Sequence, residues 1–340
     1  MKSLVQKLHA QNIYPYGSEQ ARRQEAHVAR FLAREYQSAL DSSMTLEELD
    51  VSTDQGVMFN EFQAIAKSHY DENIEIFKSF LDTAYLAYTT AFYSNIPEVV
   101  TISSLSLEEA QRNKFRLICD RIGIDGQEKI LNLGCGFGSF EVYLRQHFPQ
   151  TKLTGVNPST VQTDYIRGCM ADPDCILSDK NFNLIQQSFS DVNDECIAPG
   201  SFDIVTSIGL LEHIQNMEYF NERVAYYLKP GGKAFHHFIS SNIAIPQFID
   251  VSQNLIREYY PDGRIWPFLE LSRHTKHMKL EQNWFINGMN YWRTLDEWHS
   301  RFWRNIENVS DILTDQKIRY WNDYFILCKA CFLPMEGTLF

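Results

Sequence analysis

The adjacent residues Glu212 and His213 are the first candidates for acid–base chemistry, because they closely follow an apolar segment that ends at Ile208. A carboxylate placed there can take a proton from an ammonium group or orient an amine, and a nearby imidazole, which titrates near neutral pH, could assist. The alternative is structural: Glu212 would cap the following helix and His213 would be partly buried. The position just past a predicted strand is compatible with a role for Glu212 in proton transfer.

Two further groups could face the same site. His236 and His237 are neighbours on a predicted strand, so their side chains point to opposite faces and only one of them can reach the site. Tyr291 lies just before segment 293–295, a predicted helix start, and its hydroxyl could hydrogen-bond an anion or a substrate amine. A tyrosine packed in the core is the competing interpretation.

A glycine-rich turn indicates where a ligand binds. Segment 131–139 reads Leu-Asn-Leu-Gly-Cys-Gly-Phe-Gly-Ser, with Gly134, Gly136 and Gly138 at alternate positions around Cys135. Glycines let the backbone turn sharply and approach a ligand, and the first strand–helix turn of a doubly wound sheet binds nucleotide-like ligands. No Lys-Ser/Thr follows, which excludes a P-loop. The GxGxG spacing leaves room for the amino-acid tail of S-adenosylmethionine rather than for a pyrophosphate.

Polar residues follow the next two predicted strands. Asn157 ends the second strand, where a ribose-binding side chain, usually an acid, is expected. After the third strand, Ser188 could accept a hydrogen bond from an adenine amino group, and Phe189 could lie against the ring. Each residue alone is more often an ordinary loop residue, but their order at the ends of successive strands supports one cofactor site.

The elements that must position these residues alternate between strand and helix. Apolar runs predict strands at 129–133, 152–156, 182–186, 202–208 and 233–239, and helices are predicted at 106–121, 140–148 and 160–167. The first of these helices opens on a Ser106–Glu109 capping box. This alternation predicts an α/β fold of the Rossmann-like type with a doubly wound, mostly parallel sheet. Segment 228–232, Leu-Lys-Pro-Gly-Gly, is predicted as a turn before a central strand.

The two ends of the chain have a different character. Helical periodicity over 1–66 and 73–86 predicts an N-terminal helical region, residues 1–105, that covers the active site or forms a homodimer contact. The core is predicted at 106–340, with a helical substrate lid at 241–300. Five of the six tryptophans fall after residue 283. Core packing is favoured for each of them, although they could also wall a pocket for a hydrophobic or cationic substrate.

Composition limits the classes of function. The chain has 43 acidic and 31 basic residues and a net charge of −12, which argues against nucleic-acid binding. Seven scattered cysteines include one CxxC, at Cys328 and Cys331 in a predicted helix. This pattern argues against a zinc site, so we predict no metal, and it fits a reduced cytoplasmic protein. We also predict no signal peptide and no segment that inserts stably into a membrane.

Ordered motifs from about His69 to the C-terminus make the chain resemble one family. They are His-Tyr-Asp at 69–71, Tyr-Thr-Thr-Ala-Phe at 88–92, Ser-Leu-Glu-Glu-Ala-Gln at 106–111, the glycine-rich turn, Leu-Glu-His at 211–213, and segments 235–239 and 287–295. In them the chain resembles the cyclopropane-fatty-acid synthases, mycolic acid methyltransferases and coclaurine-type N-methyltransferases. The resemblance implies a class I methyltransferase fold, S-adenosylmethionine as cofactor and S-adenosylhomocysteine as product.

The resemblance also implies roles for single residues. Tyr88 and Thr89 would contact the methionine carboxylate of the cofactor beside Gly134, Gly136 and Gly138, whereas Asn157 and Gln162 would face its ribose. Glu212, His237 and Tyr291 match the residues that hold a bicarbonate ion in cyclopropane synthases, where the ion is the general base. Together with the position of Glu212 just past a predicted strand, this resemblance favours a functional role for its carboxylate.

Departures from the family pattern affect the expected substrate. Thr90 stands where the family has a cysteine, Asn132 where it has an acid in the glycine-loop strand, and Ser188 where it has an acid near adenine. Segments 136–140, 157–159 and 236–238 are closer to the coclaurine-type branch. We therefore expect N- or C-methylation of a small amine or natural-product precursor. The alternatives are a lipid alkene, methylated or cyclopropanated with bicarbonate as base, and a non-catalytic cofactor-binding protein.

Overall fold

A computed structural model describes residues 4–41, 58–59, 72–241, 247–248 and 263–333 of the chain. The helical periodicity predicted over 42–57 and 60–66, the motif at 69–71 and most of 242–262 in the predicted lid lie outside the described residues. The elements that carry the remaining predicted residues are all described.

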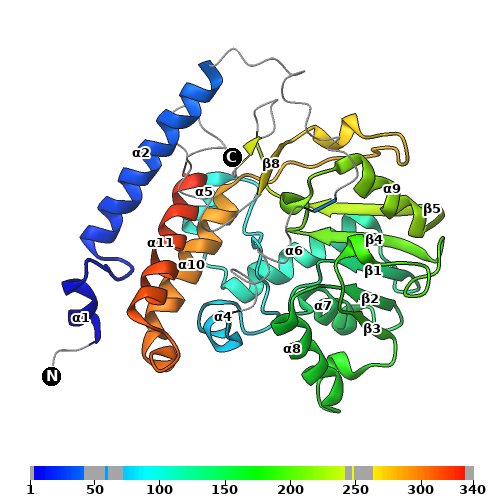
Figure 1. Cartoon of the computed structure of the whole chain (residues 1–340), viewed down its shortest axis with the longest axis horizontal. Coiled ribbons are helices and arrows are strands. Elements are labelled where there is room, and N and C mark those ends of the chain that lie inside the picture. Colours follow the sequence, from blue (N-terminus) through cyan, green and yellow to red (C-terminus); the bar gives the residue numbers. More distant parts are fainter. Residues whose placement is uncertain (1–3, 42–57, 60–71, 242–246, 249–262, 334–340) are drawn as a thin grey trace.

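Five parallel strands form the central sheet in the order β3-β2-β1-β4-β5 (Figure 1). They are β1 (Lys129–Leu133), β2 (Lys152–Val156), β3 (Phe182–Ile185), β4 (Phe202–Ile208) and β5 (Leu228–His237). The strand order reverses at β1, which has β2 on one side and β4 on the other. In such a sheet the ligand crevice opens beyond the carboxyl ends of the strands at that point. The predicted doubly wound parallel sheet is confirmed.

Strand β5 differs from the prediction in where it begins and where it lies. Residues 228–232 belong to the strand, and its pairing with β4 shifts register between Phe202 and Ile204. Gly231 has a φ of 79°, a left-handed conformation that glycine adopts without strain, so the chain bends there and still pairs with β4. Within the described sheet β5 is an edge strand. The prediction of a turn before a central strand is therefore wrong.

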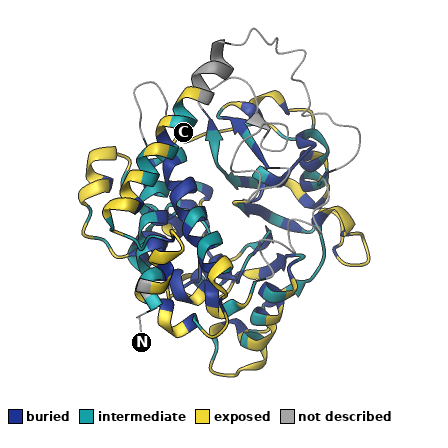
Figure 2. Cartoon of the chain, turned by 60° about the vertical axis from the view of Figure 1, so that its left-hand side comes forward, coloured by how far each residue is buried: buried dark blue, intermediate teal, exposed yellow. Residues whose placement is uncertain are grey.

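Helices cover both faces of the sheet, since alternate residues along a strand belong to different buried clusters. Ile130 of β1 shares a cluster with Phe115 and Phe140, whereas its neighbour Leu131 shares one with Phe220. Phe115 and Phe140 lie on α6 (Leu107–Ile122) and α7 (Ser139–His147), and Phe220 lies on α9 (Met217–Tyr227). Helix α8 (Thr160–Ala171) follows β2. Figure 2 shows that buried residues line the sheet and the inward sides of these helices.

Helix α6 begins where the sequence predicts. The Ser106 hydroxyl accepts the Glu109 N–H at 3.2 Å, and the Ser106 N–H donates to the Glu109 carboxylate at 2.8 Å. These reciprocal bonds satisfy backbone donors that a helix N-terminus otherwise leaves unpaired. The helix ends at Gly123, whose φ is 77°. The predicted capping box is confirmed.

A second layer of helices is built from both ends of the chain (Figure 1, blue beside orange and red). It contains α1 (Leu4–Ala10), α2 (Glu19–Asp41), α4 (Ile74–Phe80), α5 (Pro97–Ile102), α10 (Met289–Arg304) and α11 (Asp315–Phe332). Phe80 of α4 lies between Trp298 and Trp321, with ring centroids 5.9 and 5.2 Å apart. Both indoles are fully buried, so the packing interpretation is confirmed for these two tryptophans.

Helix α4 is shorter than the helix predicted over 73–86. It ends at Phe80, and the buried Asp82 carboxylate then accepts the N–H groups of Tyr85 and Ala87 at 2.6 and 2.8 Å. A short acid that takes nearby amides competes with the helical hydrogen-bond pattern. After this turn the Tyr88 ring still packs against Phe80 and Trp298 of the helical layer, and Tyr88 and Thr89 line the cavities beside the sheet.

The remaining elements are short. A small sheet in the order β6-β8-β7 joins β6 (Ser240–Ser241), β7 (Gln247–Phe248) and β8 (Arg264–Pro267). Single turns of 3₁₀ helix occur at η2 (Ile176–Ser178), η3 (Phe189–Asp191), η4 (Leu211–His213), η6 (Glu270–Arg273) and η7 (Ile306–Val309). Within the described ranges, no helix has both the length and the apolar character needed to cross a bilayer.

Candidate active site

Two adjoining cavities open at the carboxyl edge of the sheet. The smaller lies over the glycine-rich turn, and the larger, of about 850 Å³, extends along β5. Tyr88, Thr89, Gly209 and His213 line both cavities, so these residues mark the junction. A ligand over the turn and a second ligand beside β5 would meet there.

The glycine-rich turn forms one wall of the smaller cavity. Gly134, Gly136 and Gly138 have φ values of 70°, 58° and 80°, in the left-handed region that favours glycine. A Cβ atom at Gly134 would lie 3.2 Å from a methyl group of Leu210, whereas a Cβ atom at Gly136 would meet no atom within 4 Å. Cys135 lies buried in the same wall. The turn thus presents open backbone to the cavity at Gly136.

Asn157 and Gln162 also line the smaller cavity, beside the turn. The Asn157 side-chain N–H group donates to the Gly136 carbonyl at 3.0 Å and to the Gln162 carbonyl oxygen at 2.8 Å. Asn157 follows β2, and Gln162 lies in the first turn of α8, which Ser159 caps. Both amides line the smaller cavity, as their predicted place at the ribose requires.

Tyr88 and Thr89 reach the junction through the turn at Asp82. Gln111 of α6 donates to the Thr89 carbonyl at 2.9 Å, which fixes this segment against the core. The Tyr88 hydroxyl lies 3.1 Å from the Tyr324 hydroxyl of α11. The structure therefore brings both residues to the cavity that Gly134 and Gly136 line, whereas the predicted Gly138 does not line it.

Ser188 and Phe189 lie elsewhere. The Phe189 ring is buried against Phe220 and Tyr227, with centroids 5.9 and 6.1 Å apart, and the Ser188 hydroxyl pairs with Ser190 at 2.8 Å. Neither residue lines either cavity. The η3 turn directs the Phe189 ring into the core between the sheet and α9.

Glu212 is a buried carboxylate in the wall of the larger cavity. Its Oε1 accepts the Ile239 N–H at 2.7 Å, and its Oε2 has no hydrogen-bond partner among the described residues. Burial raises the pKa of Glu212 to about 7. The cap of α9 is Asn216, whose side chain accepts the Tyr219 N–H at 2.9 Å. The alternative interpretation of Glu212 as the helix cap is therefore wrong.

The predicted imidazoles are neutral at pH 7. Burial lowers the pKa of His213 to about 4, and burial together with the cations Lys114 and Arg121 lowers the pKa of His237 to about 3. A neutral imidazole can accept a proton or a hydrogen bond. Of these two histidines, only His213 lines both cavities, so it is the one at their junction.

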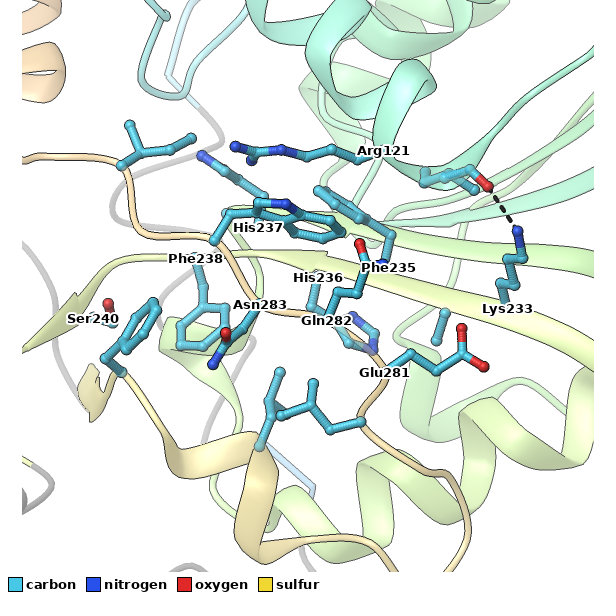
Figure 3. Close-up of a pocket in the computed structure, with 18 of the residues that line it drawn as sticks. Arg121, Lys233, Phe235, His236, His237, Phe238, Ser240, Glu281, Gln282 and Asn283 are labelled. Carbon is cyan, nitrogen blue, oxygen red and sulfur yellow. Dashed lines mark hydrogen bonds between the residues drawn. The ribbon is translucent and has the colours of Figure 1, made fainter. Parts of the chain in front are cut away.

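His236 and His237 point to opposite sides of β5, as predicted (Figure 3). His236 pairs with the Ser207 hydroxyl at 2.8 Å and packs edge-on against Phe220. Both imidazoles nevertheless line the larger cavity, because it extends around the edge strand. The expectation that only one of them reaches the cavity is therefore wrong.

Tyr291 lies in the first turn of α10 rather than before it. Its ring packs against Phe332 and Trp298, with centroids 4.8 and 6.2 Å apart, and it also lines the larger cavity. Glu212, His213, His237 and Tyr291, which come from three separate parts of the sequence, therefore line one cavity.

Two cations beside this cavity, Arg121 and Lys233, were not predicted from the sequence. Arg121 lines the larger cavity from the last turn of α6, and its guanidinium carbon lies 4.7 Å from the centre of the Trp284 ring. The Lys233 ammonium donates to the Ile122 carbonyl at 3.0 Å (Figure 3). Basic residues at a helix end are common, so only the ring contact with Trp284, which is distant in the sequence, distinguishes Arg121.

The chain belongs to the mycolic acid cyclopropane synthetase family, whose model matches residues 59–338. It is 24% identical over 277 residues to the cyclopropane-fatty-acyl-phospholipid synthase of Escherichia coli K12, covering 81% of this chain and 66% of that protein. It is also 24% identical over 244 residues to the (S)-coclaurine N-methyltransferase of Papaver somniferum, covering 68% of this chain and 66% of the relative. The chain thus spans about two thirds of the length of these relatives.

The fold agrees with this family. A crystal structure of coclaurine N-methyltransferase bound to N-methylheliamine and S-adenosylhomocysteine superposes with a TM-score of 0.79 at 18% identity, covering 96% of this chain and 92% of that one. The predicted family of S-adenosylmethionine-dependent methyltransferases and the predicted Rossmann-like fold are confirmed. Both branches named in the sequence analysis, the cyclopropane synthases and the coclaurine-type enzymes, occur among the relatives.

Proposed function

We propose that the protein transfers a methyl group from S-adenosylmethionine to the amine of a small-molecule acceptor. The observation that carries this proposal is Glu212, a buried carboxylate in the acceptor cavity with one oxygen held by Ile239 and the other unpartnered among the described residues. Its cavity adjoins the glycine-rich turn through Tyr88, Thr89, Gly209 and His213. A proton acceptor therefore lies next to the place where a cofactor fits.

We assign the cofactor contacts from the hydrogen-bond donors that line the smaller cavity. The Gln162 carbonyl oxygen is engaged by Asn157, so the Gln162 side-chain N–H group is the donor that we assign to the ribose. Gly134, Cys135 and Gly136 would surround the amino-acid tail, with Tyr88 and Thr89 at its carboxylate, whereas the predicted Gly138 lines neither cavity and would act only through the shape of the turn. We leave Ser188 and Phe189 out of this site, because neither lines a cavity.

Bound there, S-adenosylmethionine supplies an activated methyl group: the acceptor nitrogen forms the new C–N bond while the C–S electron pair returns to sulfur and leaves S-adenosylhomocysteine. The alkylated nitrogen must lose a proton, and we assign Glu212 as the group that takes it. With a pKa of about 7, this carboxyl group is part ionised at neutral pH and can both take and release a proton. Neutral His213, at the junction, orients the acceptor or assists the transfer.

The second candidate function is methylation or cyclopropanation of a lipid alkene with bicarbonate as base. It is favoured by His237, which lines the same cavity as Glu212 and Tyr291 and is close enough to Lys114 and Arg121 for both cations to lower its pKa. Positive charge near His237 would favour binding of a small anion such as bicarbonate. Turnover that requires bicarbonate would support this candidate, since an amine methylase with Glu212 as base does not need the ion.

The testing experiment combines the purified protein, methyl-labelled S-adenosylmethionine and a whole-cell extract, which is partitioned after the reaction. We expect the label in a small polar or amine-containing product, whose mass would identify the acceptor. Label in the phospholipid fraction would instead establish the lipid reaction, and the assay would then be repeated with and without bicarbonate. Binding of S-adenosylhomocysteine without label in either fraction would favour the non-catalytic alternative.

Other parts of the interpretation stay predictions. Segment 278–288 lines the acceptor cavity, as a lid would, whereas residues 289–300 lie in α10 within the helical layer. A role of the N-terminal helices in covering the site or in a homodimer, and a cytoplasmic location, are untested. Hydrogen exchange with and without S-adenosylhomocysteine would test both hypotheses. A lid at 241–300 or a cover formed by residues 1–105 should change its protection when the ligand binds.

A further inference from the structure

Arg121 is a half-buried cation to which the described residues supply no counter-charge. Its guanidinium lies against the Trp284 ring, and no hydrogen bond or ion pair joins it to any described residue. Arg301, also half-buried, shows the usual arrangement: its two terminal nitrogens donate to the two oxygens of Glu108 at 2.7 and 2.9 Å. A guanidinium carries five N–H donors in a planar fork, and partial burial removes water that would otherwise satisfy them.

Two further basic side chains, Lys114 and Lys233, lie on or beside α6. Lys114 lies seven residues before Arg121, on the same face of the helix. Its buried ammonium has no hydrogen-bond partner among the described residues, and Asp82, the acid nearest to it, already accepts two backbone N–H groups. The Lys233 ammonium lies at the Ile122 carbonyl, beside Arg121 in the chain. No acid is a cause of the Arg121 pKa shift, which comes from burial alone.

Trp284 gives this end of the cavity a flat apolar wall. Its indole lies between the Arg121 guanidinium, at 4.7 Å, and the Phe235 ring, at 6.2 Å. A guanidinium that stacks on an indole by its face keeps its edge, where the N–H groups point, open to a planar anion. In Figure 3, Arg121 and His237 lie on the same side of β5, at this wall.

We infer that the methyl acceptor carries an anionic group, a carboxylate or phosphate, which binds Arg121 beside the Trp284 ring. This inference rests on the proposed methyl transfer, whose reacting amine lies at Glu212. The acceptor class is therefore an amine with an aromatic or apolar body and an acidic group, as in an aromatic amino acid. A neutral amine would leave the Arg121 guanidinium without an anionic partner in this cavity. A free bicarbonate ion could also bind Arg121 as an anion. The test must therefore distinguish bicarbonate from the acidic group of the acceptor.

The test compares two probes of matched shape, indole-3-acetate and its neutral amide, indole-3-acetamide. Their dissociation constants are measured by calorimetry on the full chain saturated with S-adenosylhomocysteine, in bicarbonate-free buffer. We expect the wild type to bind the acid at least about tenfold more tightly than the amide, since a hydrogen-bonded pair of charges is among the stronger polar contacts. Arg121→Gln should remove this preference. Arg116→Gln, a change at an exposed arginine on the same helix, should retain it.

Four results would overturn the inference: equal binding of acid and amide, no binding of the acid, a preference that survives in Arg121→Gln, and Arg121-dependent binding of bicarbonate but not of the acid. The S-adenosylhomocysteine titration, made first, separates this inference from the proposed function. Cofactor binding without a preference for the acid would refute only the acidic acceptor. Failure to bind S-adenosylhomocysteine would refute the proposed methyl transfer and the inference together.

Discussion

The side-chain N–H group of Asn132 donates to the Glu141 carboxylate at 2.8 Å beneath the glycine-rich turn. The Asn132 carbonyl oxygen in turn accepts from the Thr206 hydroxyl at 2.9 Å, so β1, α7 and β4 are joined through one amide. Glu141 is fully buried, and its second oxygen has no hydrogen-bond partner among the described residues. The acid that the resemblance places at position 132 is absent, and a carboxyl group reaches the same place from the helix.

Glu141 should make stability depend on pH. Burial raises its pKa to about 7 from an unfolded value of 4.5. The folded state then holds a proton that the unfolded state releases, so this contribution is fully present below about pH 4.5 and is lost as the pH rises to about 7. Glu141→Gln keeps an acceptor for Asn132 and cannot ionise. The difference in unfolding free energy, Glu141→Gln minus wild type, should therefore increase by up to ~3 kcal/mol as the pH rises from 5 to 8. A constant difference in urea titrations across this range would contradict the assignment.

Glu212→Gln should separate catalysis from cofactor binding. Loss of a positioned proton acceptor typically lowers the rate by a factor of about 10² to 10⁴. The dissociation constant for S-adenosylhomocysteine should change less than about twofold, because Glu212 does not line the smaller cavity. In the wild type, the turnover number should rise with pH through about 7 as Glu212 ionises. Glu222→Gln, at an exposed position on α9, is the control. An unchanged turnover number in Glu212→Gln would exclude Glu212 as the base.

Three glycine substitutions should give different results. Gly134→Ala meets Leu210 at 3.2 Å in a left-handed conformation, so it should lower both stability and cofactor affinity. Gly136→Ala meets no atom, so its stability loss should be limited to the backbone, ~1–2 kcal/mol. Its methyl group would nevertheless face the cofactor cavity and weaken S-adenosylhomocysteine binding. Gly168→Ala, in helix α8 with open space around it, should raise stability by ~0.5–1 kcal/mol without affecting binding. Melting curves and cofactor titrations check all three, and equal binding by Gly136→Ala and the wild type would argue against a cofactor at the turn.

Lys114→Met tests the state of the buried ammonium. Burial lowers the pKa of Lys114 to about 7 from 10.5, so the unfolded state binds more protons between these values and stability should rise with pH there. Relative to Lys114→Met, the wild type should gain ~2 kcal/mol between pH 7 and 9. The comparison uses the difference in unfolding free energy between the two proteins, which cancels groups common to both. A difference that falls with pH would show that Lys114 is stabilised as a cation.

The regular part of the fold could be predicted because its signals are local. Apolar runs and glycine spacing identify the five strands and the turn at Gly134, and the capping box identifies the start of α6. The burial of Glu141 could not be predicted, because an acid on a helix usually faces water and only a partner from β1 explains it. Phe189 was predicted to lie against a ligand, but α9 offers its ring a closer apolar core. The environment of the Arg121 guanidinium could not be predicted either, because it is formed by contact with Trp284, which is distant in the sequence.

The helical layer, built from both ends of the chain, sets the order in which the protein can mature during synthesis. The Ala91 N–H donates to the Thr294 hydroxyl 203 positions later, and Tyr88 meets Tyr324 near the end of the chain. Contacts of such long range form slowly and leave apolar surface exposed until they do. The sheet and its glycine-rich turn are complete well before α10 and α11 have been translated. The segment that carries Tyr88 thus acquires its last contacts only when the C-terminal helices dock, so cofactor capture should be the final event of folding.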